Sequence, residues 1–472
     1  MKTVDAFTEY IGKIDSEFRC VTELGGSSGP LAASHTIYPT MTAGNRFAIH
    51  PMEGWDAQRN GLPSENTLRR WENFGRSGAK LVWGGEAFAV QEDGRANPNQ
   101  LFLNPAVDVA GGLSTLRNRL LEGHRSQELE TDDLVIGLQL THSGRFSRPD
   151  GEAAPKSASR NPVLDRKYGF DESVPLLTDG ELEAIGERFV QSAKLAVEVG
   201  FDFVDVKCCH GYLLHELLGA RTREGKYGGS FANRILLFKR IISEIRANCS
   251  DLPIGVRLSA GDIHPFAPNA ETRVGEPITG GESYGMGFGT DQDRTTAMDL
   301  EEPFLFLKEL LDLDITLLNV TLGSPYYCPH LQRPALYPPS DGYLPPEDPL
   351  LSVYRHIETV REIKHAYPQL TLVGTGYSYL QEWLPHVAEY EVGEGNLDFV
   401  GLGRMVLSYP ELPLDVLNDR QLARKKICRT FSDCTTAPRQ GMASGCYPLD
   451  PYYRKTDAAE ILKRLKKELA GK

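Results

Sequence analysis

The residues best suited to chemistry lie close together near the middle of the chain. Lys207, His210 and Tyr212 follow a short apolar run within the stretch GFDFVDVKCCHGYLLHELLGARTREGKYGGSFANR. At the end of a strand, an imidazole and a phenol can hydrogen-bond a reacting oxygen and deliver a proton, and a lysine adds a cation. Alone, His210 would more often be a satisfied structural histidine, but the Gly-Tyr that follows it favours a functional one.

These residues need a scaffold, and the sequence has the pattern of one. Short apolar runs alternate with longer amphipathic stretches, which is typical of βα units. Eight strands are predicted, at 47–50, 80–83, 135–141, 203–207, 254–258, 316–320, 371–375 and 399–401. Eight units favour an α/β fold closed as a (β/α)8 TIM barrel over an open doubly wound sheet. The dinucleotide-binding alternative lacks its motif, because Gly401-Leu402-Gly403 is followed by no third glycine.

The clearest helix is predicted from 178 to 200. Thr178 and Glu181 have the spacing of a capping box, and Gly200 is the expected C-terminal stop. Further helices are predicted at 233–248 and from positions 303, 350 and 380, and Gly78 should end the first one.

Long loops rich in Pro and Gly interrupt this pattern at 146–177, 261–298 and 324–349. In a barrel these loops follow the third, fifth and sixth strands and lie at the catalytic face. We therefore expect a barrel over residues 1–420 and a short C-terminal extension over 421–472.

Composition narrows the partners. The net charge of -13 argues against nucleic acid and anionic membranes, which require an extended basic surface, so we expect a small-molecule substrate and leave a homo-oligomer open. The basic end, KRLKKELAGK, is interpreted as the polar face of a terminal helix. The N-terminus has no signal-peptide run, and eight cysteines without framework spacing indicate a reducing compartment. We expect a cytoplasmic protein.

The stretch around His210 closely resembles the old yellow enzyme family, NADH:flavin oxidoreductases in which His-x-x-His or His-x-x-Asn leads into Gly-Tyr-Leu and then Tyr-Gly-Gly-Ser-x-x-Asn-Arg. Other strands match in order, at NRFAIHPM, IGLQLTHSGR, IGVRLSAGD and GLGRMVLSYP. The resemblance spans roughly residues 45–410 and implies a barrel that binds FMN.

The resemblance also implies which residues hold FMN. Gln139 corresponds to the amide at the flavin pyrimidine edge, and Arg257 to the cation beside flavin N1 and O2. Each glycine alone would more often mark a tight turn, but in this order the glycines imply backbone N–H groups at the phosphate, with Arg404 adding charge. The full set is Pro51, Met52, Glu53, Ala87, Gln139, Arg257, Gly374, Gly376, Gly403 and Arg404.

The implied catalytic residues are Lys207, His210 and Tyr212. In the family, the first and fourth residues of the His motif hydrogen-bond the substrate's carbonyl or nitro oxygen, and the tyrosine protonates the α carbon. His210 and Tyr212 match this pattern, whereas Lys207 does not. A lysine at this position has two alternative consequences. It favours a carboxylate substrate or an enolate-like intermediate, or else it abolishes ordinary enone reduction. Trimethylamine dehydrogenase and its relatives also depart here and oxidise amines, so the substrate class stays open.

Glu53 is a second departure, because many relatives have Thr or Cys near flavin O4. A carboxylate there would repel the reduced ring unless it is protonated or turned away. We expect Glu53 to pair with Lys207, which would neutralise both. Other polar residues near the strand ends suit either the substrate mouth or loop packing, with packing slightly favoured: His142, Arg145, Tyr326, Tyr327, His330 and Arg333.

A damaged motif lies near the C-terminus. Cys428, Cys434 and Cys446 resemble three of the four cysteines that hold a 4Fe–4S cluster in the dienoyl-CoA reductase branch, with Phe431 at the second position. We therefore expect no iron–sulfur cluster and no other metal. The segment is interpreted as a remnant packed on the barrel, and a cluster with Asp433 or Ser432 as substitute ligand, or a zinc site, is less favoured. That branch also carries a second flavin and a nucleotide-binding portion, for which this sequence ends too soon, so we expect NAD(P)H as a diffusible reductant.

The leading hypothesis is an FMN-dependent oxidoreductase, an ene-reductase that passes hydride from NAD(P)H to an activated alkene of an α,β-unsaturated carbonyl compound. The alternatives are an amine-oxidising or demethylating flavoenzyme on the same barrel and a flavin-binding barrel without catalysis.

Overall fold

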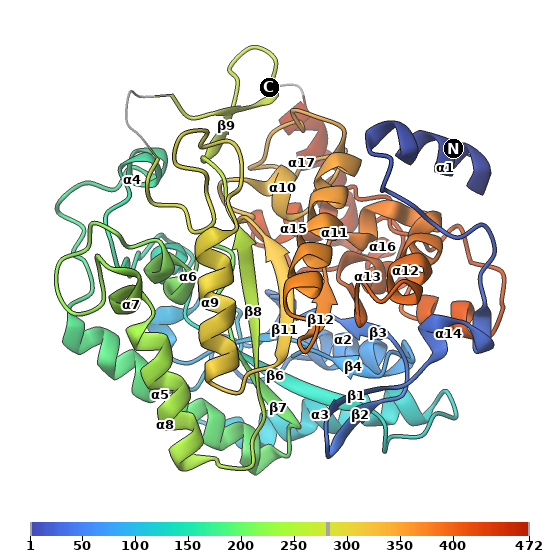
Figure 1. The fold of residues 1–472 in the computed structure, drawn as a ribbon, viewed down its shortest axis with the longest axis horizontal. Helices are drawn as coiled ribbons and strands as arrows, with labels where there is room; N and C mark the ends of the chain where they lie inside the picture. Colours follow the sequence, from blue (N-terminus) through green and yellow to red (C-terminus); the bar gives the residue numbers. More distant parts are fainter. Residues whose placement is uncertain (1, 280–283, 471–472) are drawn as a thin grey trace.

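Eight parallel strands close into a barrel in the computed structural model, which describes residues 2–279 and 284–470 (Figure 1). The strands are β3 (Phe47–Ile49), β4 (Leu81–Val82), β6 (Val135–Thr141), β7 (Phe203–Val206), β8 (Ile254–Gly261), β11 (Leu317–Leu322), β12 (Thr371–Gly374) and β13 (Phe399–Leu402). Pairing of β13 with β3 and of β4 with β6 completes the circle. The predicted (β/α)8 barrel is confirmed, with every predicted strand in place.

The second strand of the barrel is split, which the sequence pattern did not indicate. β4 pairs with the start of β6, and a further short strand, β5 (Ala87–Ala89), pairs with its end. Between them the backbone passes very close to β6, because a side chain on Gly84 would come within 2.8 Å of the Gln139 backbone nitrogen. This kink brings Ala87 into register with Gln139.

Helices cover the outside of the barrel. They include α2 (Glu65–Arg76), α3 (Val109–Arg125), α5 (Asp179–Val199), α8 (Leu236–Asn248), α9 (Glu301–Asp312), α11 (Pro349–Ala366) and α12 (Leu384–Gly393). The capping box at Thr178 and the left-handed Gly200 are as predicted for α5. The helix predicted from 233 starts in α7 (Phe231–Arg234). The prediction from position 380 was wrong, because Gln381 has a positive φ within the 3-10 segment η5 (Tyr377–Trp383) and α12 begins after it.

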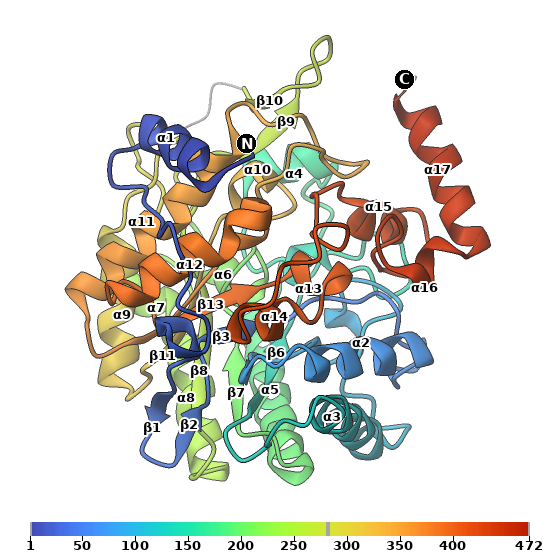
Figure 2. The ribbon, with the colours of Figure 1, turned by 90° about the vertical axis from the view of Figure 1, so that its right-hand side faces the viewer.

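The lower end of the barrel interior is apolar and closed. Inward-facing side chains at the strand starts pack together there, Phe203, Leu317 and Phe399 among them. A hairpin of β1 (His35–Tyr38) and β2 (Met41–Ala43) covers this end, and Ile37, Met41 and Ala43 join the same cluster (Figure 2). Apolar burial at this end is the scaffold on which the opposite end is built.

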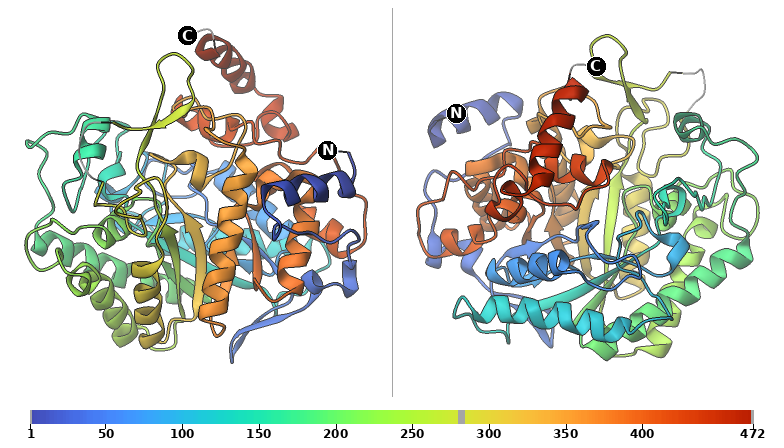
Figure 3. Two further views of the ribbon diagram at one scale, coloured as in Figure 1. Left: turned by 45° about the horizontal axis from the view of Figure 1, so that its top comes forward. Right: turned by 180° about the vertical axis from the view of Figure 1, so that it is seen from behind.

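The long loops and the C-terminal segment gather at the opposite end, where the strands terminate (Figure 3). The loops carry α4 (Pro162–Tyr168), the hairpin β9 (Phe266–Pro268) and β10 (Gly275–Pro277), and α10 (Pro329–Gln332). Within the predicted loop 261–298, residues 280–283 lie outside the described part of the chain. The C-terminal segment forms α15 (Asp433–Arg439), α16 (Pro451–Arg454) and α17 (Asp457–Ala470). None of the helices described is both long and apolar enough to cross a bilayer.

Candidate active site

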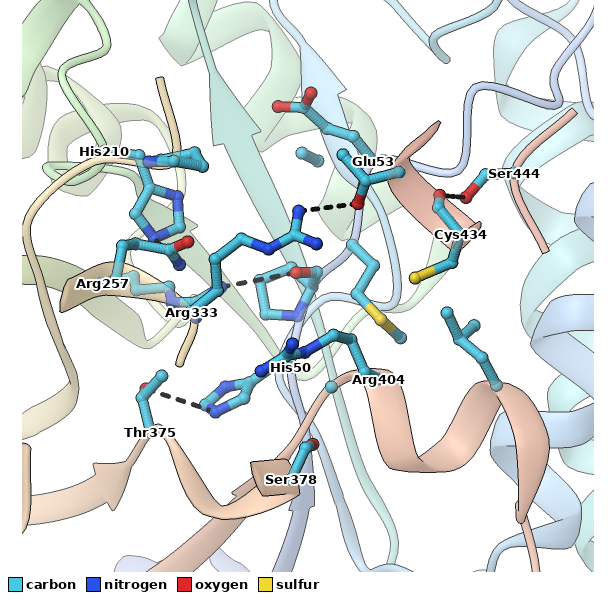
Figure 4. Close-up of a pocket in the computed structure, with 18 of the residues that line it drawn as sticks. His50, Glu53, His210, Arg257, Arg333, Thr375, Ser378, Arg404, Cys434 and Ser444 are labelled. Atoms are coloured by element: carbon cyan, nitrogen blue, oxygen red, sulfur yellow. Dashed lines mark hydrogen bonds between the residues drawn. The ribbon is translucent and has the colours of Figure 1, made fainter. Parts of the chain in front are cut away.

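One cavity of about 240 Å³ opens where the barrel strands end (Figure 4). Twelve of the thirteen predicted site residues line it: Pro51, Met52, Glu53, Ala87, Gln139, Lys207, His210, Tyr212, Arg257, Gly376, Gly403 and Arg404. Gly374 is the exception, because its α carbon faces Leu397 and Tyr377 rather than the cavity. Six further residues were expected either at the substrate mouth or in loop packing, and two of them, Tyr326 and Arg333, also line the cavity.

A buried carboxylate supports the floor of the cavity. Asp205 on β7 accepts hydrogen bonds from Gln139 Nε2 at 2.6 Å, from Trp83 Nε1 at 2.7 Å and from the Arg257 backbone N–H at 2.7 Å. Burial raises the pKa of Asp205 to about 6. Asp205 thus fixes the two residues expected at the flavin pyrimidine. The alternation of β7, in which Phe203, Asp205 and Lys207 share one face, was the signal that would have found it.

Arg257 is a buried cation with spare hydrogen-bonding capacity. Its Nη1 lies 3.4 Å from the Pro51 carbonyl oxygen, and its Nε has no hydrogen-bond partner within the described structure. Burial lowers the pKa of Arg257 from its ordinary value. A buried guanidinium is costly without an electron-rich group beside it, so its place beside the cavity suits an electron-rich ligand.

A neutral histidine completes the floor, and sequence reasoning missed it. His50 Nδ1 lies 3.1 Å from Asn319 Nδ2, and His50 Nε2 lies 3.3 Å from Thr375 Oγ1. The ring fills the space over Gly401, where a side chain would come within 2.1 Å of it. Burial, aided by Arg257, lowers the pKa of His50 well below its usual range. His50 therefore acts as a hydrogen-bonding spacer rather than as a cation.

Lys207, Glu53, Tyr212 and Tyr326 form a second group. Lys207 Nζ lies 3.5 Å from Glu53 Oε1, so the expected ion pair is present, and it also lies 3.7 Å from the centre of the Tyr212 ring. The Tyr212 hydroxyl donates to Glu53 Oε1 and lies 2.8 Å from the Tyr326 hydroxyl. Lys207 is therefore balanced by a carboxylate and does not face the cavity as a free cation.

His210 occupies an unusual backbone position, with φ of +67°. Few residues other than glycine adopt this left-handed region, and exceptions gather at functional sites. Its Nε2 lies 3.1 Å from Gln332 Nε2, and burial lowers the pKa of His210 well below its usual range. The imidazole is thus neutral and can donate a single hydrogen bond into the cavity.

Two arginines meet where Gly376 and Gly403, which follow β12 and β13, line the cavity. Arg404 Nη2 donates to the Pro334 carbonyl at 2.8 Å and Arg333 Nη1 to Thr435 Oγ1 at 2.6 Å, while Arg404 Nη1 and Arg333 Nη2 lack partners among the described groups. Burial and the neighbouring Arg404 lower the pKa of Arg333 to about 10. Two guanidinium groups with spare N–H donors beside Gly376 and Gly403 suit a phosphate. Arg333 was not among the predicted cofactor residues.

The C-terminal segment forms part of the cavity wall, which the interpretation as a packed remnant did not include. Cys434, Thr435, Pro438, Arg439 and Ser444 face the cavity. The Arg439 guanidinium pairs with Asp341 at 2.6 Å and lies 5.1 Å from the Trp55 ring centre and 5.6 Å from that of Tyr326. Phe431, at the missing cysteine, packs on Tyr337. Among the described residues, no set of three His, Cys, Asp or Glu side chains is placed to hold a metal ion.

The residues present fit FMN. The unpartnered Nε of Arg257 matches an electron-rich ring edge, and the spare donors of Arg333 and Arg404 beside two glycines match a phosphate. Figure 4 shows His210, Glu53, Arg257 and Arg404 around the same space.

The NADH:flavin oxidoreductase / NADH oxidase family matches residues 36–272, half of the chain. The chain belongs to this family. The resemblance seen in the sequence is thereby confirmed. Within the family, the chain is 31% identical over 234 residues to an NADPH dehydrogenase of Geobacillus sp. (strain WCH70), a match that covers 48% of this chain and 62% of that protein. The chain thus matches less than two thirds of the length of this relative.

Two solved structures share the fold. A 2-naphthoyl-CoA reductase superposes with a TM-score of 0.64 at 18% identity, covering 90% of this chain and 57% of the other. Histamine dehydrogenase from Rhizobium sp. 4-9 superposes with a TM-score of 0.62 at 19% identity, covering 90% of this chain and 52% of the other.

Proposed function

We propose that this family member is an FMN-dependent oxidoreductase, an ene-reductase that uses NAD(P)H to reduce an activated alkene conjugated to a carbonyl group. One observation carries the proposal: a single cavity joins unpartnered guanidinium donors, on Arg257 and Arg404, to a neutral imidazole and a phenol, on His210 and Tyr212. The first pair suits an electron-rich cofactor, and the second suits a carbonyl oxygen and a carbon that must be protonated.

Each residue has a role that follows from its position. Bound FMN would supply the hydride chemistry. Gln139, fixed by Asp205, would hydrogen-bond the pyrimidine edge, and Arg257 would stabilise negative charge there. His210 would polarise the substrate carbonyl, and Tyr212 would hold the proton for the α carbon. The Lys207–Glu53 pair leaves no net charge beside His210, which supports an uncharged enone more than a carboxylate.

The nicotinamide is proposed to bind in the same cavity as the substrate. The cavity is small, and its walls are formed by residues of the strand ends and of the C-terminal segment. A shared cavity requires oxidised nicotinamide to leave before the alkene enters, which gives ping-pong kinetics. In this proposal electrons pass from the nicotinamide to the flavin and on to the alkene without an iron–sulfur cluster.

Amine oxidation is the second candidate. It is favoured by Glu53, a carboxylate that accepts the Tyr212 hydroxyl and can receive a proton removed from an amine. The structural neighbours of this chain include proteins named histamine dehydrogenase and 6-hydroxypseudooxynicotine amine oxidase. A flavin-binding barrel without catalysis would show neither reaction.

A visible spectrum followed by anaerobic titration tests the proposal. We expect a yellow protein whose flavin is bleached by NADPH or NADH in the absence of any amine, and whose colour returns on adding 2-cyclohexen-1-one. Bleaching by histamine or a tertiary amine, and not by either nicotinamide, would replace the proposal with amine oxidation. A yellow protein whose flavin is bleached neither by NADPH or NADH nor by an amine would be a flavin-binding barrel without catalysis.

A further inference from the structure

The Tyr212 hydroxyl is nearly buried and is held by two side chains. The residue is 2% exposed, and its hydroxyl hydrogen bonds in the described structure are to Glu53 and Tyr326. Burial, followed by the charge of Glu53, raises the pKa of Tyr212 well above its usual range. A phenolate left behind by proton donation would therefore be strongly disfavoured, so Tyr212 requires a neighbour that returns its proton in each turnover.

Glu53 is placed to be that neighbour. Its side chain is 15% exposed, so its carboxyl group reaches the cavity solvent while it accepts the Tyr212 hydroxyl. Its loop is held rigidly, because the next N–H, of Gly54, donates to Glu86 Oε1 at 3.0 Å, and Glu86 in turn pairs with buried Arg70 at 2.6 Å. Rigid support of this kind is what a proton-transfer contact requires.

Lys207 stabilises the anionic form of this carboxyl. Its Nζ lies 3.5 Å from Glu53 Oε1 and 3.7 Å from the Tyr212 ring centre. The ammonium group thus stands beside both sites on which negative charge resides during a transfer. Other titratable groups that face this contact include Cys209, His210, Tyr326 and Arg439.

We propose that Glu53 is a catalytic proton carrier, which returns to Tyr212 the proton that this residue gives to the substrate. In the reductive direction, the Tyr212 O–H bond breaks as the substrate α C–H bond forms, and the electron pair stays on the phenol oxygen. The Glu53 carboxylate then takes a proton from a hydronium ion in the cavity, and this carboxyl O–H bond breaks as the Tyr212 O–H bond forms again. Glu53 is left once more as a carboxylate paired with Lys207. This assignment rests on the proposed function, because it names the proton source for that reaction.

The test separates one turnover from many. Glu53→Gln keeps the size and an oxygen acceptor but carries no acidic proton. In anaerobic stopped flow with 2-cyclohexen-1-one, we expect its first flavin reoxidation to stay within about threefold of wild type, since Tyr212 still holds one proton. Its steady-state rate should fall about tenfold or more, and this fall should deepen as the pH rises. The control is Glu92→Gln, whose side chain is 72% exposed and which should match wild type in both rates.

A structural role for Glu53 would give a different result. If Glu53 merely positions Tyr212, the first turnover and the steady state fall together, and that outcome overturns the proposal, as does a steady-state rate equal to that of wild type. A second measurement needs no flavin turnover. In an alkaline titration of tyrosinate absorbance, Glu53→Gln should ionise one tyrosine at lower pH than wild type, and this component should vanish in the double variant with Tyr212→Phe.

The two measurements distinguish the possible failures. If NADPH does not bleach the flavin, or the enone does not restore it, the proposed function fails while the titration still decides whether Glu53 acts on Tyr212. An unchanged titration in Glu53→Gln would overturn the proton-carrier assignment whatever the reaction is.

Discussion

The two ends of the barrel interior are built from the same strands and differ completely in character. At the lower end Phe203, Leu317 and Phe399 pack into an apolar layer under the β1–β2 hairpin. Two residues farther along these strands the inward positions are Asp205, Asn319 and Gly401, which border the cavity floor. Side chains two positions apart in a strand share a face, so each strand supplies one apolar residue and then one functional residue to the interior.

The two ends of the barrel interior contribute differently to the free energy of unfolding. The lower layer consists of buried apolar side chains, so it contributes to stability through burial. The upper layer holds buried guanidinium and carboxyl groups whose desolvation is only partly offset. Substitutions at the two ends should therefore separate stability from ligand binding.

The largest expected loss of stability is at the lower end. Phe203 is fully buried, lies against Trp83 with ring centres 5.3 Å apart, and fills the space that Gly137 leaves. Phe203→Ala should lower the free energy of unfolding by about 3–5 kcal/mol, measured in urea, because it opens a cavity in a closed layer. The exposed Leu305→Ala is the control and should cost less than about 1 kcal/mol. Equal losses in the two variants would refute the contrast between layers.

A smaller, pH-dependent effect is expected at the rim. Asp262, just after β8, accepts from Tyr327 at 2.6 Å, and burial raises its pKa from 3.8 to about 7. Between about pH 4 and 7 the Asp262 carboxyl is therefore protonated in the folded state and ionised in the unfolded state. The stability that this bound proton supplies is lost as the pH rises through 7. From pH 5 to 8, wild type should lose on the order of 2 kcal/mol relative to Asp262→Asn. Parallel unfolding curves across this range would show that Asp262 is already ionised at pH 5.

The smallest change in stability is expected at Arg257, although its effect on binding should be large. Arg257→Met removes a buried charge that makes one long side-chain hydrogen bond to the described part of the chain, so the free energy of unfolding of the apoprotein should change by less than about 1 kcal/mol. Affinity for FMN, followed by fluorescence quenching, should fall about tenfold or more. Arg294→Met, at a side chain that is 78% exposed, should leave both quantities unchanged. A variant that binds FMN like wild type would remove Arg257 from the site.

The barrel was predictable because its signals are local. Each strand is a short apolar run, and the α5 capping box at Thr178 and stop at Gly200 are encoded within a few residues. Most of the site was predictable through the family motif, which gave Gln139, Arg257 and His210 at strand ends that the barrel then brings together. The Glu53–Lys207 pair was predicted from the places of both residues in the family pattern and from their opposite charges, and the contact is present.

The rest depended on three-dimensional contacts. The second strand is split where Gly84 lies close to β6, and this contact leaves no trace in the pattern of apolar and polar residues along the sequence. Asp205 and His50 matter because they hydrogen-bond Gln139, on the neighbouring strand β6, and Asn319, on β11. These partners are 66 and 269 residues away in the chain. Gly374 follows the family order, yet a side chain at this position would meet Leu397, and it is the next glycine, Gly376, that lines the cavity.

The C-terminal position of one cavity wall has a consequence for how the protein is made. Arg439 reaches back across the sequence to Asp341, Trp55 and Tyr326, and Thr435 supports Arg333. A nascent chain whose eight strands have already left the ribosome still lacks Thr435 and Arg439. Its cavity remains open on one side, so we expect tight retention of a cofactor only after the segment that follows the barrel has been synthesised.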